Sequence, residues 1–132
     1  MHRNTYLNSP LLLNSDYSLR TNENLFFAGQ MTGVEGYVES ASSGLVAGMS
    51  AAARAVGEEP AILPRKTMIG ALASYVSDPN VTDFQPMNAN FGLMPPIRVK
   101  GGKSKRAEVH SATALAELDE FISSTEDRYL RI

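Results

Sequence analysis

The stretch that decides the fold runs from Leu25 to Gly57 and reads LFFAGQMTGVEGYVESASSGLVAGMSAAARAVG. Leu25–Ala28 is a short apolar run of the kind that forms a buried strand. Glycines follow at positions 29, 33 and 36 and predict a tight turn. A helical pattern then runs over about residues 37–56 and stops at Gly57. The stretch therefore predicts a strand, a glycine-rich turn and a long helix.

Small side chains recur along the predicted helix. They are Ser40, Gly44, Ala47, Gly48, Ala51 and Ala55, and the bulkier Val38, Leu45, Val46 and Met49 occupy neighbouring positions. Small side chains on one face let another backbone approach closely. Glu35 and Glu39 lie near the start of the helix, where acidic side chains interact favourably with its dipole.

Local composition predicts the elements on either side. Residues 2–14 suit a packed loop, residues 18–20 a short strand and residues 21–24 a turn. Residues 68–76 predict a short helix, and residues 81–98 predict an ordered, buried loop because they are apolar but interrupted by prolines. A last helix is expected after Gly102, with one apolar face made of Ala107, Ala114, Leu115, Leu118, Phe121 and Ile122.

These patterns predict an α/β chain that is mainly helical, with one or two short strands belonging to a larger sheet. We expect two regions. Residues 1–59 hold the loop, the strand, the glycine turn and the long helix. Residues 60–132 form a helical region with a buried proline-rich loop.

The composition excludes several classes of protein. The chain has 132 residues, a formal net charge of −2 and no cysteine, so disulfides, thiolate metal sites and thiol catalysis are excluded. Its charge gives no general sign of nucleic-acid binding, and any RNA contact must be local. We find no membrane-spanning stretch or signal peptide in the sequence and expect a cytoplasmic location.

A buried strand followed by a glycine turn and a helix places free backbone N–H groups where they can meet an anion. The spacing of Gly29, Gly33 and Gly36 does not fit the G-x-G-x-x-G dinucleotide fingerprint. On spacing alone, a tight turn without any ligand is the favoured explanation of the glycines. The motif by itself leaves both interpretations open.

The residues of three segments resemble those of a known protein family. Residues 24–40 read NLFFAGQMTGVEGYVES, residues 1–10 read MHRNTYLNSP and residues 84–96 read FQPMNANFGLMPP. Together they resemble, in the same order, the folate- and FAD-dependent tRNA uracil-5-methyltransferases. The first segment is long and quite specific to that family.

The resemblance implies a glutathione-reductase-like fold that binds FAD. It places six residues near the polar parts of the flavin: Gly29, Gln30, Gly33, Val34, Glu35 and Gly36. The implied reaction transfers a one-carbon unit from methylenetetrahydrofolate to carbon five of a uridine in the T-loop of tRNA. Reduced FAD supplies the electrons, and NAD(P)H replenishes them.

Departures from the family also carry information. The N-terminal dinucleotide-binding strand with its glycine fingerprint and the family's catalytic cysteines are absent from this sequence. The resemblance therefore implies a C-terminal part of the enzyme that lacks catalytic residues and is inactive by itself. Its expected partners are the missing N-terminal FAD-binding half, tRNA and, through an incomplete core, other copies of itself.

Two groups of residues are candidates for contact with folate or tRNA. They are His2, Arg3 and Asn4 at the start, and Asn88, Asn90 and Phe91 in the proline-rich loop. Amides can hydrogen-bond a pterin or a base, and a phenyl ring can stack on it. A core role for the loop is equally compatible with its composition. No metal site is expected, because neither histidine has a second ligand at metal spacing.

Lys100, Lys103, Lys105 and Arg106 form the main basic cluster, which suits either RNA phosphates or simple solvation. Two other functions stay open for the whole chain. One is a non-catalytic structural or interaction module. The other is part of the related flavoproteins that modify the wobble uridine.

Overall fold

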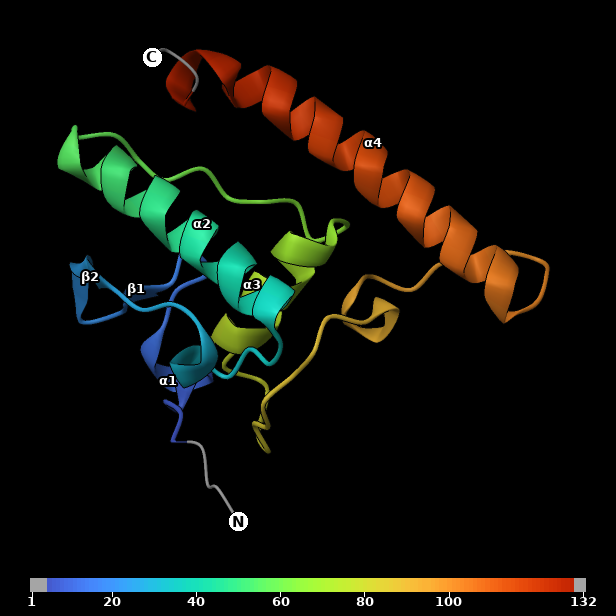
Figure 1. The fold of residues 1–132 in the computed structure, drawn as a ribbon, viewed down its shortest axis with the longest axis horizontal. Helices are drawn as coiled ribbons and strands as arrows, with labels where there is room; N and C mark the ends of the chain where they lie inside the picture. Colours follow the sequence, from blue (N-terminus) through green and yellow to red (C-terminus); the bar gives the residue numbers. More distant parts are fainter. Residues whose placement is uncertain (1–4, 130–132) are drawn as a thin grey trace.

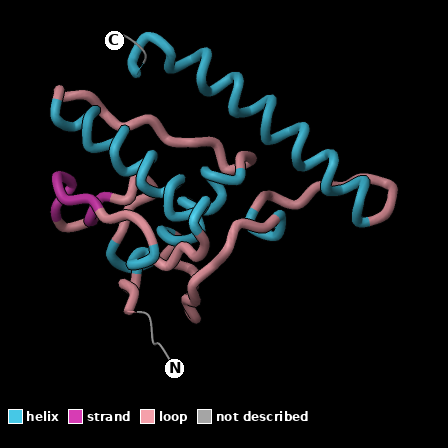
Figure 2. The backbone as a smooth tube through the Cα atoms, in the orientation of Figure 1, coloured by secondary structure: helices cyan, strands magenta, loops and turns pink. Residues whose placement is uncertain are grey.

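The computed structural model describes residues 5–129, with side chains described as far as residue 125. Its α-helices are α1 (Ser9–Leu12), α2 (Tyr37–Ala55), α3 (Met68–Ser77) and α4 (Lys103–Tyr129). Its other elements are the strands β1 (Ser18–Leu19) and β2 (Asn22–Phe26) and the 3-10 turns η1 (Gln30–Thr32) and η2 (Phe91–Leu93). Figures 1 and 2 show a mainly helical chain with one small hairpin, which confirms the predicted balance of elements.

The hairpin corrects two predictions. β1 and β2 pair antiparallel, with Ser18 opposite Phe26 and Leu19 opposite Asn22, so the chain turns before residues 22–24 and these belong to β2. β2 is also not a buried strand, because Leu25 is 45% exposed. Among the described residues the sheet has only these two strands, and β2 therefore keeps one open edge.

The first segment contains a regular element that its composition did not predict. Pro10 lies in the first turn of the short helix α1, where the missing N–H group of proline costs nothing. The expectation of close packing holds, because Ser9 and Pro10 are buried. The Arg20 guanidinium ties this region to α3 by donating from Nη2 to the Ser77 carbonyl oxygen over 2.6 Å.

The core lies where α2, α3 and the hairpin meet. It consists of Leu13, Tyr17, Val34, Val46, Ala47, Leu72, Ala73 and Val76. Tyr17 is the largest of the fully buried side chains, and burial raises the pKa of its hydroxyl group. The core thus contains one fully buried aromatic residue, which lies directly before β1.

Helix α2 matches its predicted bounds to within one residue. Its end is a Schellman motif: Gly57 N–H donates to the Arg54 carbonyl over 3.0 Å and Glu58 N–H donates to the Ala53 carbonyl over 2.9 Å. Gly57 has φ +77°, which explains the stop at a glycine. The small residues divide between two environments. Ala47 is buried, whereas Gly44 and Gly48 are exposed and would have no neighbour within 4 Å of an added Cβ.

Helix α3 begins at a side-chain cap. Thr67 Oγ1 accepts from Gly70 N–H over 3.0 Å and donates to the Pro64 carbonyl over 2.7 Å. The chain passes so close to α3 here that a Cβ on Gly70 would lie 2.1 Å from the Pro64 oxygen. Gly70 is therefore required by packing rather than by an unusual backbone angle.

The proline-rich loop and α4 are less buried than predicted. The loop over residues 81–98 is ordered and irregular, but Met94 is its only buried residue because the loop runs over the surface. Helix α4 extends to Tyr129 and lies along the outside of the molecule (Figure 1). Its predicted apolar face is consequently half-open, with Leu115 64% exposed. No helix among the described residues has the length and apolarity to cross a membrane.

Two glycines in helices are expected to respond oppositely to alanine. Gly70→Ala forces a Cβ against the Pro64 carbonyl and should destabilise the fold by about 1–3 kcal/mol. Gly48→Ala meets open space and should stabilise α2 by about 0.5–1 kcal/mol, because alanine loses less backbone entropy. Urea denaturation of both variants measures the difference. Equal effects would contradict the close passage at Pro64.

Candidate functional site

The glycine turn joins β2 to α2 through backbone angles that suit glycine. Gly29, Gly33 and Gly36 have φ of +78°, +91° and +105°, in a region that other L-residues rarely adopt. The turn is braced internally, since Thr32 Oγ1 donates to the Gly29 carbonyl over 2.7 Å. It is braced to α2 as well, because Gly29 N–H donates to Ser43 Oγ over 2.7 Å.

A loop from far along the chain pairs with this turn. Glu35 N–H donates to the Met87 carbonyl and Met87 N–H donates to the Gly33 carbonyl, both over 2.9 Å. These bonds form a parallel bridge between Val34 and Met87. The structure thus brings together the turn and the 84–96 segment, two of the three segments that carry the family resemblance.

The Phe84 ring occupies the space where Gly33 has no side chain. A Cβ on Gly33 would lie 2.3 Å from Phe84 Cζ. The ring has little freedom to move, since it contacts Tyr6 at 5.9 Å and Tyr75 at 5.5 Å between ring centroids. Gly33 is therefore required for internal packing, whatever the turn binds.

The outer side of the turn opens into a hollow of about 260 Å³ lined by Gln30, Gly36, Tyr37 and Ser40. Gly36 is the N-cap of α2 and has no side chain that could accept from the first N–H groups of the helix, of which only that of Glu39 has a side-chain acceptor among the described residues, its own carboxylate. Tyr37 is 97% exposed beside them. The hollow thus offers backbone donors, an amide, a hydroxyl group and an aromatic ring.

The six predicted cofactor residues divide between this hollow and the interior. Gln30 and Gly36 line the hollow, and a Cβ on Gly29 would meet nothing within 4 Å. Gly33 and Val34 are buried, and the Glu35 carbonyl accepts from Asn88 Nδ2 over 3.0 Å. Tyr37 and Ser40 line the hollow without having been predicted. Their position beside the N-cap glycine was the signal in the sequence.

Glu39 folds back across the start of α2. Its Oε1 accepts from Ala89 N–H over 3.0 Å, and its Oε2 lies 2.1 Å from where a Cβ on Gly36 would stand. Hydrogen bonds from the backbone of Ala89, its own backbone N–H and the Asn88 side chain hold the pKa of this carboxyl group below its ordinary value. A negative charge in the first turn also offsets part of the helix dipole.

The predicted substrate residues that the structure describes have different contacts. His2, Arg3 and Asn4 lie outside the described residues. Asn88 adjoins the glycine turn through Glu35, whereas Asn90 is used by its own loop, capping η2 with Oδ1 and donating from Nδ2 to the Asn88 carbonyl. Phe91 stacks on His110 of α4 at a centroid distance of 5.3 Å. No sequence pattern predicted that contact, because it joins a loop to a distant helix.

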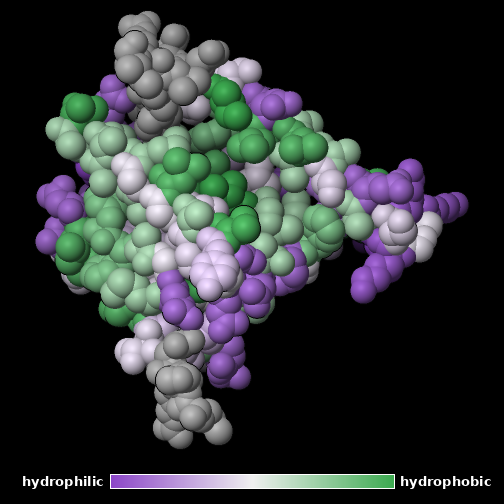
Figure 3. Space-filling view, viewed as in Figure 1, coloured by the Kyte–Doolittle hydropathy of each residue, from purple (hydrophilic) through white to green (hydrophobic). Residues whose placement is uncertain are grey.

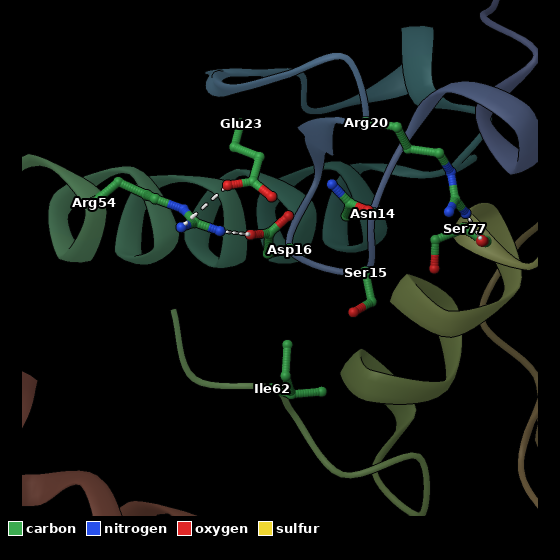
Figure 4. A pocket seen from close by; sticks show the side chains of 8 residues that line it. All are labelled: Asn14, Ser15, Asp16, Arg20, Glu23, Arg54, Ile62 and Ser77. Atoms are coloured by element: carbon green, nitrogen blue, oxygen red, sulfur yellow. Dashed lines mark hydrogen bonds and ion pairs between the residues drawn. The ribbon is translucent and has the colours of Figure 1, made fainter. Parts of the chain in front are cut away.

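Another hollow, of about 420 Å³, lies between the hairpin and α3 (Figure 4). Its lining residues are Asn14, Ser15, Asp16, Arg20, Glu23, Arg54, Ile62 and Ser77. The Arg54 guanidinium lies 3.9 Å from Asp16, 3.4 Å from Glu23 and 3.3 Å from Glu59. The Arg54 cation already faces three carboxylates. We therefore interpret this cluster as a structural contact that stabilises the packing of α2 on the hairpin, and not as a binding site.

The contact between Gly33 and Phe84 predicts coupled substitutions. Gly33→Ala should cost about 2–5 kcal/mol, from the left-handed backbone and the clash with the ring. Combining it with Phe84→Ala removes the clash, so the double variant should lose at least about 1 kcal/mol less than the sum of the single variants. Denaturation of the four proteins of the cycle measures this coupling. Additive losses would show that the ring does not limit position 33.

Glu39 predicts an acid-sensitive contact between α2 and the loop. Its folded-state pKa is lowered, so its stabilisation is complete above the pKa of the unfolded chain and is lost as the pH falls through the folded-state value. Glu39→Gln should flatten this part of the pH dependence of unfolding, and the Ala89 amide proton should report the same transition by NMR. The matched control is Glu120→Gln on the exposed side of α4, which should leave the profile unchanged. An identical profile for Glu39→Gln would contradict the contact.

Comparison with known proteins gives consistent matches. A family model described as Glucose inhibited division protein A matches residues 1–59. The methylenetetrahydrofolate--tRNA-(uracil-5-)-methyltransferase TrmFO of Lysinibacillus sphaericus is 50% identical over 94% of this chain and 29% of that protein. The TrmFO protein of Natranaerobius thermophilus is 53% identical over 92% of this chain and 28% of that protein. The chain thus spans under a third of these relatives, and it is homologous, over nearly its whole length, to one segment of the TrmFO methyltransferases.

Proposed function

We propose that this chain is the C-terminal part of a cytoplasmic flavoprotein that makes 5-methyluridine in the T-loop of tRNA. Methylenetetrahydrofolate is the carbon donor and NAD(P)H the source of reducing equivalents. The observation that carries the proposal is the uncapped start of α2 beside an open hollow, in a segment homologous to TrmFO. Within this enzyme the chain's role is to hold one edge of the FAD ring system.

The residues of the hollow fit a ring edge rather than a phosphate. The first N–H groups of α2 and the Gln30 and Ser40 side chains provide hydrogen-bond donors to carbonyl oxygens. Glu39 already offsets part of the positive end of the helix, which disfavours a fully charged group there. Polar heteroatoms along a flavin's pyrimidine edge match this set of donors.

The size of the hollow limits what this chain can hold. About 260 Å³ is below the roughly 300–1,000 Å³ typical of pockets for whole ligands. We infer that the described residues contact only part of the cofactor and that the nucleotide portion binds to another part of the enzyme. This division agrees with a chain that corresponds to 29% of its relatives.

The chain's own residues bind and orient, and none of them is a candidate nucleophile. Bound FAD, once reduced, would supply electrons for the transfer of the one-carbon unit. The chain contains no cysteine, so a covalent attack through sulfur has to come from elsewhere in the enzyme. Asn88 is exposed and bonded to the turn, and it is our candidate for contact with folate or tRNA next to the turn.

The alternative is a non-catalytic module in which the glycines serve packing alone. The contact between Gly33 and Phe84 favours that interpretation for one glycine. The packing interpretation does not explain why Gly29 has an open side or why Tyr37 is 97% exposed. A relationship to the wobble-uridine flavoproteins is less favoured, because the curated relatives compared above are named as uracil-5-methyltransferases.

A chimera tests the proposal. This chain replaces the matching segment of the Bacillus cytotoxicus TrmFO protein, with which it is 52% identical. We expect the chimera to bind FAD and to methylate tRNA that lacks the T-loop methyl group. Gln30→Ala and Ser40→Ala should each weaken flavin binding by about 3- to 12-fold, the equivalent of one hydrogen bond. Flavin absorbance and fluorescence titrations measure the affinity.

Gln85→Ala is the matched control, since Gln85 is an exposed glutamine outside the hollow. It should leave flavin affinity unchanged. A folded chimera that binds no flavin, or equal losses for Gln30→Ala and Gln85→Ala, would reject this hollow as a cofactor site and favour the packing module.

A further inference from the structure

A different hollow, of about 460 Å³, lies between η2 and the first turns of α4. Its lining residues are Phe91, Gly92, Lys103, Arg106, Ala107 and His110. It shares no residue with the hollow at the glycine turn. Apolar and aromatic surface forms most of its wall, and two cationic side chains add positive charge.

The aromatic part of this hollow is held in place. The Phe91 and His110 rings are nearly parallel, with an angle of 9° between their planes and 5.3 Å between centroids. Asn90 fixes the position of Phe91, because its Oδ1 accepts from Gly92 N–H over 2.9 Å. Phe91 is nevertheless 39% exposed. An ordered, exposed aromatic ring suits stacking by an unpaired nucleobase.

The charge around this hollow differs from that of the whole chain. Five of the twelve Lys and Arg residues lie between positions 98 and 106, although the chain has a net charge of −2. Lys105 is paired with Glu108 over 3.2 Å, whereas Lys103 and Arg106 have no ion pair within the described part of the chain. Figure 3 shows hydrophilic side chains gathered where α4 begins, at the right of the view.

The basic side chains at the start of α4 lie at a position that is unfavourable for positive charge. The first turn of α4 contains Lys103, Lys105 and Arg106 and no acidic residue. The N-terminus of a helix is its positive end, so cations there are unfavourable. Among the described residues, Lys105 is compensated by its ion pair with Glu108, whereas Lys103 and Arg106 are not, and such locally unfavourable arrangements are expected at functional sites. A bound anion would relieve this repulsion.

We propose that this hollow binds an unpaired nucleotide of RNA. The base stacks on the exposed side of the Phe91 and His110 pair, and the flanking phosphates contact Lys103 and Arg106. Charge complementarity argues for a polyanion, and the aromatic wall argues for one that carries unpaired bases. The choice of RNA rests on the proposed function, because that enzyme acts on tRNA.

The test is binding of a fluorescently labelled RNA hairpin with an unpaired loop to this chain, followed by anisotropy over a range of salt concentrations. Phe91→Leu keeps an apolar side chain but removes the ring, and should weaken binding at least about fivefold. Lys103→Ala and Arg106→Ala should weaken binding and reduce the slope of log affinity against log salt by about 0.7–0.9 each.

Two matched variants keep the test specific. Lys105→Ala removes the same charge from the same turn, but Lys105 already faces Glu108 and lies outside the hollow, so its loss of affinity should be clearly smaller. His110→Phe keeps a stacked ring and should retain the affinity of the unsubstituted chain. Circular dichroism establishes that each variant is folded.

Three results would overturn the proposal: no RNA binding by the unsubstituted chain, equal losses for Lys103→Ala and Lys105→Ala, or equally tight binding of polyglutamate. A flavin titration distinguishes failure of the RNA site from failure of the cofactor site. If Phe91→Leu weakens RNA binding while the chimera binds no flavin, the RNA site stands and the cofactor site fails. If flavin binds but none of the hollow variants affects RNA binding, the RNA site fails alone.

Discussion

The backbone pairing of Gly33 and Glu35 with Met87 is the interaction on which the candidate cofactor site depends. Two hydrogen bonds of 2.9 Å join a turn to a loop that is distant in sequence. They can form because Gly33 adopts a left-handed backbone and leaves room for the Phe84 ring. The same pairing places Ala89 within reach of Glu39, so a backbone N–H group of the loop stabilises the carboxylate at the start of α2.

The two hollows differ in the charge of the groups around them, and the two proposed ligands differ accordingly. At the glycine turn, a carboxylate already offsets the positive end of α2, and the free groups are hydrogen-bond donors. At the start of α4, cations add to the positive end of the helix instead. A neutral ring edge suits the first environment and a polyanion suits the second. Under the two proposals, one short chain would contact both a cofactor and a nucleic acid.

Local sequence patterns were sufficient for the helices with strong boundary signals. α2 ends at a glycine that completes a Schellman motif, and α3 ends before an Asp-Pro pair, so both bounds follow from nearby residues. Sequence patterns did not predict burial correctly where burial depends on which other elements pack against a segment. The apolar run that begins at Leu25 was predicted to be buried, but Leu25 is exposed in β2, whose sheet has only two strands among the described residues. The proline-rich loop likewise contains apolar residues yet lies on the surface.

The sequence by itself determined the strand, turn and helix order, the absence of thiol chemistry and the family to which its segments are similar, because each depends on residues close together in the chain. Only the tertiary structure decided what each candidate residue faces. It showed that Gly33 packs on Phe84, that Gln30 and Gly36 line a hollow, and that Phe91 stacks on His110. Such contacts join residues distant along the chain, and their geometry is set by how the helices and loops pack together.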